Sequence, residues 1–146
     1  MKRSIISFLE HNAALFVFAI ASIAFAGSLI AEWSGVIPCE LCWFQRICLY
    51  PLIPITLVGM IRHDRNLPWY VIPLSIIGSI VALYQYLLYT GIIDESLAPC
   101  SIGVSCTQEL PTYLGFFNLI NLSFLAFVTI TVLMIISARG AAKEQQ

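Results

Sequence analysis

The chain has 146 residues, of which 60% are hydrophobic and only 10% are charged, and its formal net charge is −1. A soluble domain carries about 25% charged residues, so this composition excludes an ordinary water-soluble domain. The net charge by itself identifies no partner, and no nucleic-acid ligand is expected.

Four apolar stretches are long enough to cross a membrane as helices. A helix rises about 1.5 Å per residue, so roughly 20 residues cross a hydrocarbon core of about 30 Å. The bilayer core offers the backbone no water, and each stretch must therefore be helical. The predicted helices span residues 12–32, 43–61, 67–89 and 114–138. We predict an all-α integral membrane protein, a single antiparallel four-helix bundle over residues 1–146.

The first stretch resembles a secretory signal peptide at its N-terminal end. Lys2 and Arg3 precede the apolar run, and residues 24–26 are Ala-Phe-Ala, as at a cleavage site. The apolar run nevertheless continues through residues 27–31, which makes it longer than the roughly 7–15 residues of a signal core. We therefore predict that it is retained as the first membrane helix.

Prolines mark the second and third predicted helices. Pro51 and Pro54 lie inside the second one, where each removes a backbone hydrogen bond. Membrane helices tolerate this loss when their neighbours satisfy the freed carbonyls. Pro68 lies in the first turn of the third helix, and Gly91 follows its last turn. These positions predict a second helix that is bent near its middle and a third helix with sharp ends.

The basic residues predict the orientation in the membrane. All Lys and Arg residues except Arg46 lie before the first helix, between the second and third, or after the fourth. Short loops rich in Lys and Arg remain in the cytoplasm. Both termini are therefore predicted to be cytoplasmic, and loops 33–42 and 90–113 extracytoplasmic, in a multi-pass protein of a bacterial plasma membrane.

Four of the five cysteines fall in the two loops that are predicted to lie outside. They are Cys39, Cys42, Cys100 and Cys106, and no cytoplasmic loop contains a cysteine. Disulfides persist outside the membrane, whereas the cytosol keeps thiols reduced. Cys48 lies within the second helix, where a buried free cysteine is usually a small apolar filler. The other four predict thiol–disulfide chemistry on the outer side.

Cys39-Glu40-Leu41-Cys42 is a C-x-x-C motif at the entrance of the second helix. A thiolate is the reactive form of cysteine, and the unpaired N–H groups of a helix N-terminus stabilise it. Cys42 should benefit more than Cys39 because it lies deeper in the helix. Arg46 lies one turn further along the same face of the helix, where placing a charge inside the membrane costs free energy. We predict that it interacts with the Cys42 thiolate and a reducible head group; the alternative is an arginine that snorkels to the interface.

The second pair, Cys100 and Cys106, lies in the longest outer loop. A bridge between them would close a small ring that is exposed and easily attacked. A purely structural bridge and cross-pairing between the two loops remain alternatives, because sequence does not determine connectivity. A four-cysteine zinc centre is a further alternative, although C-x₅-C suits zinc less well than C-x₂₋₄-C. Two inert disulfides in a structural membrane protein would leave Arg46 unexplained.

The segment Cys39-Glu-Leu-Cys-Trp-Phe-Gln-Arg46 resembles the DsbB/BdbC family of disulfide bond formation proteins, whose C-x-x-C is followed by x-x-x-Arg at the start of the second helix. The resemblance covers nearly the whole chain, since the family also has four helices, inner termini and a second cysteine pair in the second outer loop. Quinone-linked epoxide reductases are similar bundles, so the opposite direction of electron flow is the nearest alternative.

The resemblance implies a membrane enzyme that reoxidises a thioredoxin-like thiol oxidase of the DsbA/BdbD type and passes electrons to ubiquinone or menaquinone. It implies two redox disulfides, Cys39–Cys42 and Cys100–Cys106. The partner's thiolate would attack Cys100, and the released Cys106 would attack Cys39. Cys42 would then pass two electrons to the quinone, and Arg46 would bind the quinone carbonyl. The outcome would be disulfide formation in exported proteins.

Two features of this chain vary among the members of the family. The short spacing between Cys100 and Cys106 resembles the smaller, BdbC-like members. Tyr84-Gln85-Tyr86 stands where many short members have Tyr-His-Tyr. Gln85 can donate a hydrogen bond to a quinone oxygen but cannot supply a proton near neutral pH. A quinone-binding role is predicted for Gln85, and packing between helices for the two tyrosines.

Overall fold

The computed structural model describes residues 2–35, 37–94 and 119–143, and all regular structure within these ranges is helical. Within these ranges, four segments are long and apolar enough to cross a membrane, and α2 and α3 together form one of the four. This confirms the prediction of an all-helical protein with four spans. The helices are α1 (Lys2–Trp33), α2 (Glu40–Leu49), α3 (Leu52–Arg62), α4 (Leu67–Tyr89) and α5 (Leu119–Lys143).

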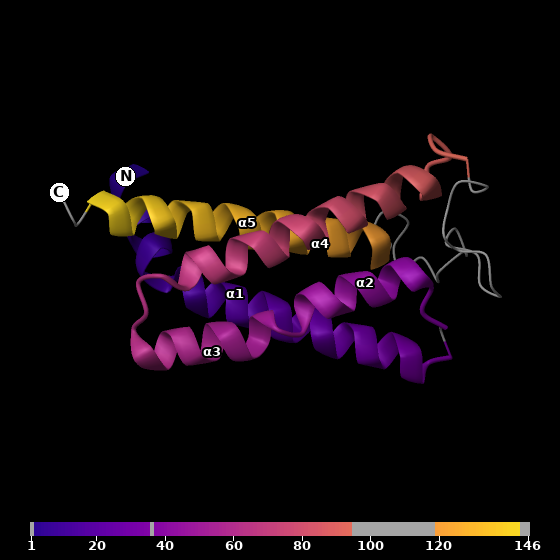
Figure 1. The fold of residues 1–146 in the computed structure, drawn as a ribbon, viewed down its shortest axis with the longest axis horizontal. Helices are drawn as coiled ribbons and strands as arrows, with labels where there is room; N and C mark the ends of the chain where they lie inside the picture. Colours follow the sequence, from indigo (N-terminus) through magenta and orange to yellow (C-terminus); the bar gives the residue numbers. More distant parts are fainter. Residues whose placement is uncertain (1, 36, 95–118, 144–146) are drawn as a thin grey trace.

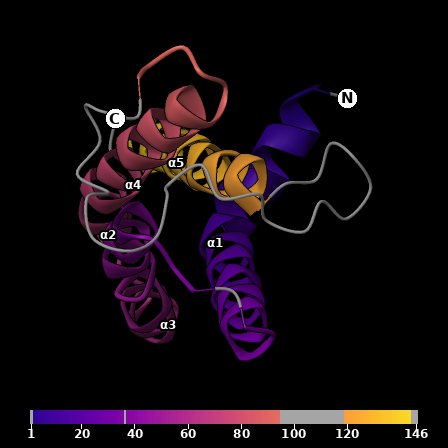
Figure 2. The same cartoon turned by 90° about the vertical axis from the view of Figure 1, so that its right-hand side faces the viewer.

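The helices run up and down as a bundle, with both termini at the same end (Figure 1). Viewed along the bundle, α5 lies between α1 and α4, and α2 and α3 follow one another beneath α4 (Figure 2). Helix α4 packs against α5 and α2, while α1 packs against α5 and α3. We call the end that carries Cys39 and Cys42 the cysteine end and the opposite one the terminal end. The side of the membrane that each end faces stays a prediction.

The second span is broken in its middle, as the prolines predicted. The N–H of Tyr50 donates to the carbonyl of Arg46 at 2.9 Å, which closes α2, and Pro51 then opens α3. Proline has no N–H to continue the ladder, and its ring clashes with the preceding turn. The break changes the direction of the chain while α2 and α3 together still cross the membrane.

Other helix ends agree only in part with the predicted boundaries. Pro68 lies in the first turn of α4, and Gly91 beyond its end has φ +72°, as expected of a helix-terminating glycine. Helix α1 begins at Lys2 rather than near residue 12. Hydropathy marks the part of a helix that lipid requires, whereas the helix itself can continue beyond it. Residues 114–118 of the last predicted helix lie outside the described residues.

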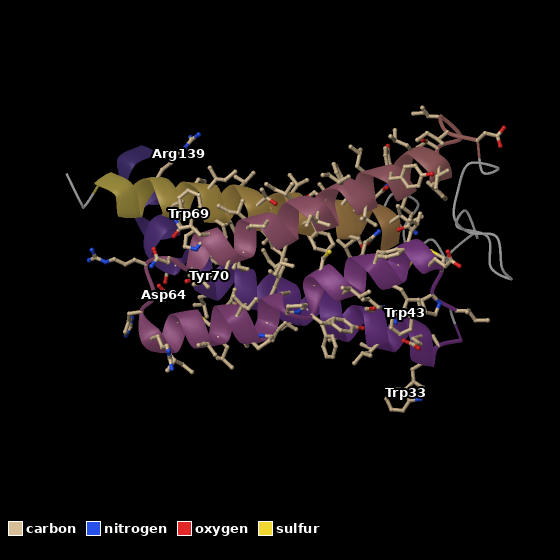
Figure 3. All side chains as sticks on the ribbon, viewed as in Figure 1. Trp33, Trp43, Asp64, Trp69, Tyr70 and Arg139 are labelled. Atoms are coloured by element: carbon tan, nitrogen blue, oxygen red, sulfur yellow. The ribbon has the colours of Figure 1, made fainter. Side chains whose placement is uncertain are left out.

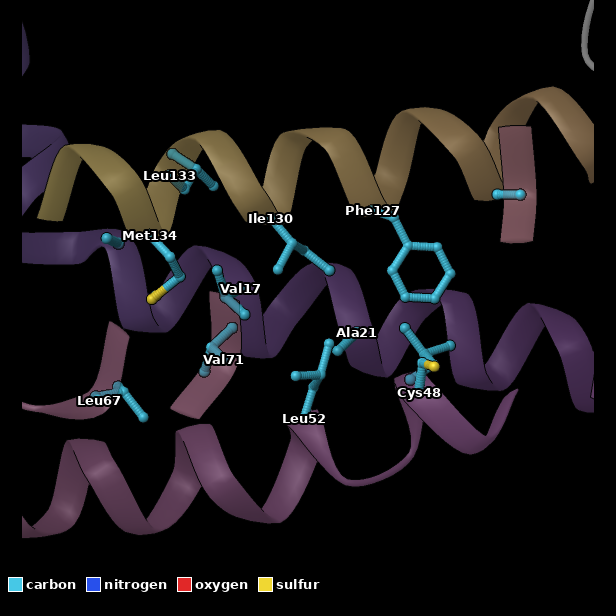
Figure 4. Packing of buried hydrophobic residues seen from close by; sticks show 13 residues of the cluster. Val17, Ala21, Cys48, Leu52, Leu67, Val71, Phe127, Ile130, Leu133 and Met134 are labelled. Carbon is cyan, nitrogen blue, oxygen red and sulfur yellow. The ribbon is translucent and has the colours of Figure 1, made fainter. Parts of the chain in front are cut away.

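The largest core cluster lies where all five helices meet, between the middle of the bundle and the terminal end (Figure 4). Small residues on α1 allow α5 to approach closely, as is common where membrane helices pack. A hydrogen bond of 2.9 Å from Thr131 Oγ1 to Ser75 Oγ adds a polar link between α5 and α4. The buried residues are Ala13, Val17, Ala21, Cys48, Leu49, Leu52, Leu67, Val71, Ala82, Phe127, Ile130, Leu133 and Met134.

Aromatic and apolar side chains cover much of the outside of the bundle, as lipid contact requires (Figure 3). Trp33 and Trp43 lie at the cysteine end, and Trp69 and Tyr70 lie at the terminal end. Tryptophan and tyrosine gather at membrane–water interfaces. The two groups therefore mark two interfacial levels on either side of an apolar band.

We expect Gly78→Ala to destabilise the bundle, because a Cβ at Gly78 would clash with the ring of Phe127, which is buried between α4 and α5. Overpacking costs about 1–3 kcal/mol, which should outweigh the roughly 1 kcal/mol by which alanine favours a helix. Thermal unfolding in detergent should show a lower midpoint. Gly27→Ala is the matched control, because a Cβ there meets no atom within 4 Å. Equal midpoints for both variants would contradict this packing.

Candidate active site

The first turn of α2 positions the two cysteines of the C-x-x-C motif. Cys39 is the N-cap residue, with φ −72° and ψ 169°, and its carbonyl accepts a hydrogen bond from the Trp43 N–H at 3.2 Å. Helix α2 begins at Glu40, earlier than the predicted residue 43, so Cys42 lies within its first turn. The N–H groups of this turn have no partner within the helix and favour negative charge nearby.

The two sulfur atoms are neighbours. Cys39 Sγ and Cys42 Sγ lie 3.1 Å apart, and both residues are free thiols in this structure. A disulfide has an S–S distance of about 2.05 Å, so closing the bond requires a movement of roughly 1 Å. Cys39 is buried, whereas Cys42 is only half-buried. The pair is therefore a dithiol arranged for oxidation, with Cys42 as its more accessible member.

Two buried glutamines contact the cysteine pair. Gln85 of α4 directs Nε2 at Cys39 Sγ and at Cys42 Sγ, each at 3.4 Å. Its Oε1 accepts a hydrogen bond of 2.6 Å from Nε2 of Gln45 on α2. The quinone-binding role of Gln85 stays a prediction, and the amide that was expected to donate to a quinone oxygen lies against the two sulfurs. Gln45 was not singled out in the sequence, although a polar residue between membrane-spanning apolar residues is a signal for a buried contact.

The hydrogen bond between the cysteines makes them chemically unequal. It raises the pKa of the Cys39 thiol far above its ordinary value, and burial raises it further. Cys39 therefore keeps its proton and donates it in the hydrogen bond. With Cys39 as the donor, the Cys42 sulfur accepts from this thiol, and Gln85 donates to it as well. Negative charge is consequently best accommodated on Cys42, the position that the helix N-terminus also favours.

Arg46 is buried one turn below Cys42 and is held by α1. Its Nη1 lies 2.8 Å from Glu32 Oε2, and its Nη2 donates to the Ser28 carbonyl at 3.3 Å. The guanidinium also lies over the Trp43 ring, 5.2 Å from its centre. An arginine in a membrane span requires a counter-charge. Glu32, which sequence reasoning missed, was detectable as an acidic residue at the end of an otherwise uncharged span.

The remaining cysteines lie apart from this site or outside the described residues. Cys48 is a buried free thiol within the core cluster, as expected of an apolar filler. Cys100 and Cys106 lie outside the described residues, and the pairing and the zinc alternative that depend on them stay untested. Within the described part of the chain, no three His, Cys, Asp or Glu side chains come together as a metal site.

A pocket of about 440 Å³ lies at the terminal end, far from the cysteines. Apolar residues of α3 and α4 line most of it, with Arg62, Asp64 and Tyr70 completing its wall. Asp64 and Tyr70 appear at the opposite end of the bundle from Trp43, which follows Cys42 (Figure 3). This pocket contributes nothing to the dithiol site.

Comparison with known proteins identifies the family. The family model described as "Disulfide bond formation protein DsbB" matches residues 10–138. The chain belongs to the DsbB family. The family resemblance carried by the segment from Cys39 to Arg46 is thereby confirmed, and this DsbB-family chain is a membrane protein of disulfide bond formation.

Relatives within the family cover most of the chain. "Probable disulfide formation protein C 2" of Bacillus anthracis is 40% identical over 121 residues, which cover 82% of this chain and 86% of the relative. The protein of the same name from Bacillus cereus is 39% identical, over 78% of this chain and 81% of its own. "Disulfide bond formation protein C" of Bacillus subtilis is 35% identical, over 84% and 92%. No solved structure matches the chain.

Proposed function

We propose that this protein is a quinone-dependent thiol–disulfide oxidoreductase that reoxidises an extracytoplasmic thioredoxin-like thiol oxidase of the DsbA/BdbD type. The observation that carries the proposal is the dithiol at the start of α2, with sulfurs 3.1 Å apart and hydrogen-bond donors directed at Cys42. Closing this dithiol releases two electrons and two protons, so a two-electron acceptor is needed. Membership of the DsbB family supports the same reading.

The residues around Cys42 fit the head group of a membrane quinone, either ubiquinone or menaquinone. Cys42 is half-buried at the start of a membrane-crossing segment, and the exposed Trp43 ring beside it is an interfacial side chain. The buried Arg46 guanidinium has five N–H donors, and a quinone carbonyl is an acceptor for such a group. A bound quinone supplies a two-electron, two-proton acceptor. We propose that Arg46 holds it and that Cys42 faces it.

The unequal cysteines support a direction for thiol exchange. We propose that the partner's thiolate attacks Cys100 of a Cys100–Cys106 disulfide and that the released Cys106 attacks Cys39 of the oxidised Cys39–Cys42 pair. Cys42 then leaves as the thiolate, and a stabilised leaving thiolate leaves faster. Gln85 lies within 3.4 Å of its sulfur, in position to stabilise that charge. The partner's second thiolate releases Cys100, which attacks Cys106 and frees Cys39 from the mixed disulfide. The Cys39–Cys42 pair, now fully reduced, would return to a disulfide by giving two electrons and two protons to a bound quinone.

The exchange requires access to a buried sulfur. Cys39 packs in a small cluster with Leu41 and Leu88 and is covered on most sides. Cys106 must therefore reach it through a local opening of this cluster. We expect bulkier substitutions at Leu88 to slow exchange with the partner more than they slow oxidation of an already reduced pair.

We propose that the cysteine end faces the extracytoplasmic side of a bacterial plasma membrane and that both termini are cytoplasmic. Among the described residues, Arg62 ends α3 and Arg65 lies in the short connection to α4, next to Asp64. Asp64 and Arg139, which lies near the end of α5, are both at the terminal end (Figure 3). Lys and Arg near short connections favour the cytoplasmic side. This orientation places the dithiol in the compartment where disulfides form.

Dithiol-dependent quinone reduction by the purified protein tests the proposal. With a reduced thioredoxin-like donor, the wild type should reduce quinone, while Cys42→Ala and Cys106→Ala should both fail. A small dithiol should restore activity to Cys106→Ala but not to Cys42→Ala, because it can reduce the inner pair directly. Cys48→Ala is the matched control and should retain the wild-type rate. The proposal is wrong if the wild type reduces no quinone with any dithiol.

A further inference from the structure

The two buried glutamines of the cysteine end form one connected amide pair. Gln45 is 7% exposed and Gln85 is 2% exposed, and they come from α2 and α4. Burying a carboxamide in an apolar bundle is costly unless its donors and acceptor find partners. The hydrogen bond of 2.6 Å between Gln45 Nε2 and Gln85 Oε1 gives the NH₂ group of Gln45 an acceptor and the oxygen of Gln85 a donor.

This bond determines which end of the Gln85 carboxamide faces the cysteines. A carboxamide has an accepting oxygen at one end and a donating NH₂ at the other. Because Gln45 donates to the oxygen, the NH₂ group of Gln85 points at the sulfurs of Cys39 and Cys42. The reversed orientation would place an oxygen against the sulfur that carries negative charge, and two acceptors would then face each other. Without Gln45, only the contact with the sulfurs would orient the carboxamide, and its oxygen would lose the donor that holds it away from them.

We propose that Gln45 is a positioning residue that holds the Gln85 carboxamide with its NH₂ toward the cysteine pair and thereby stabilises the Cys42 thiolate. The inference deepens the proposed function, on which it rests for the role of that thiolate. A neutral amide donates without itself exchanging a proton, so its support of Cys42 is the same at every working pH. Gln45 contacts neither sulfur and acts only through Gln85.

The test measures how the rate of Cys42 alkylation depends on pH, in reduced protein that carries Cys48→Ala, Cys100→Ala and Cys106→Ala. Gln45→Met has similar volume but no donor, so the midpoint of the profile should move up by about one pH unit. At neutral pH this is roughly a tenfold slower reaction, because alkylation follows the thiolate fraction. Gln45→Asn keeps the amide but shortens its reach, and should move the midpoint in the same direction.

A double variant separates positioning from simple packing. If Gln45 acts only through Gln85, then Gln45→Met combined with Gln85→Met should give the same profile as Gln85→Met alone. Ser79→Ala is the matched control on α4, because its hydroxyl bonds within the helix to the Ser75 carbonyl at 2.8 Å; its profile should equal that of the parent protein.

Two outcomes would overturn the inference: an unchanged midpoint in both Gln45 variants, or shifts that add in the double variant. Circular dichroism of each variant shows whether it is folded, and a Gln45→Met protein that does not fold leaves Gln45→Asn to decide. The assay uses neither quinone nor partner protein. It therefore gives its answer whether or not the proposed quinone reduction is observed.

Discussion

In the fully reduced protein, Cys42 is expected to react with iodoacetamide roughly 100-fold faster than Cys39 at pH 7.5. The hydrogen bond to Cys42 raises the pKa of the Cys39 thiol, and burial adds to the increase. A thiol with the ordinary pKa of 9.0 is only a few per cent ionised at pH 7.5, and each further unit lowers that fraction about tenfold. Cys42 is also the more exposed of the two residues.

The sign of the pH dependence follows from the same contact. Because the pKa of Cys39 is raised, increasing the pH to 9 should leave this residue largely protonated and unlabelled. In Cys42→Ala the largest cause of the raised pKa is absent, so labelling of Cys39 should begin at lower pH. Peptide mapping by mass spectrometry, in protein with alanine at Cys48, Cys100 and Cys106, measures both rates. Equal labelling of the two residues at pH 7.5 would contradict the assigned roles.

Glu32→Ala is expected to destabilise the protein and to abolish quinone reduction. It leaves the buried Arg46 guanidinium without its counter-charge at 2.8 Å. Leaving a buried charged donor unsatisfied costs about 1–3 kcal/mol, and solvent screening favours the lower part of that range because Glu32 is 44% exposed. Unfolding in mixed detergent micelles measures the loss. Glu40→Ala, an exposed carboxylate in the first turn of α2, is the control and should cost less than about 1 kcal/mol.

A double variant separates the structural part of this ion pair from its chemistry. Combining Arg46→Met with Glu32→Ala removes the buried charge together with its partner, so much of the lost stability should return. Quinone reduction should stay absent, because the guanidinium proposed to bind the head group is gone. Stability losses that simply add would show that Glu32 does not support Arg46. Recovery of quinone reduction in the double variant would remove Arg46 from the proposed site.

Several features of the site could be predicted because they depend only on residues that are close together in the sequence. The C-x-x-C motif predicted a dithiol at the start of a helix, and Cys39 is the N-cap of α2 with Cys42 in the first turn. Pro51 predicted the bend, since a missing N–H interrupts a helix wherever it occurs. The family could be predicted for the same reason, because its motif is a short contiguous segment.

The partners of the site residues could not be predicted in this way. The interaction of Arg46 with Cys42 stays a prediction, and the ion pair of Arg46 with Glu32, 14 residues away on α1, was not predicted. The quinone-binding role of Gln85 stays a prediction, and the contacts of its amide with two cysteines, 46 and 43 residues away in sequence, were not predicted. Gln45 was not singled out because the residue to which it donates, Gln85, is 40 residues distant in sequence.

By itself, the sequence determined that this protein has four membrane spans, a broken second helix and a dithiol at the start of that helix. Hydropathy, proline geometry and helix capping are local effects, and a linear pattern therefore contains them. The tertiary structure alone decided which side chains meet the dithiol. Contacts among α1, α2 and α4 depend on how each helix is rotated about its axis and on how closely its neighbours pack. In a membrane helix, the face toward lipid and the face toward protein are both apolar, so the rotation of the helix is determined only in the assembled bundle.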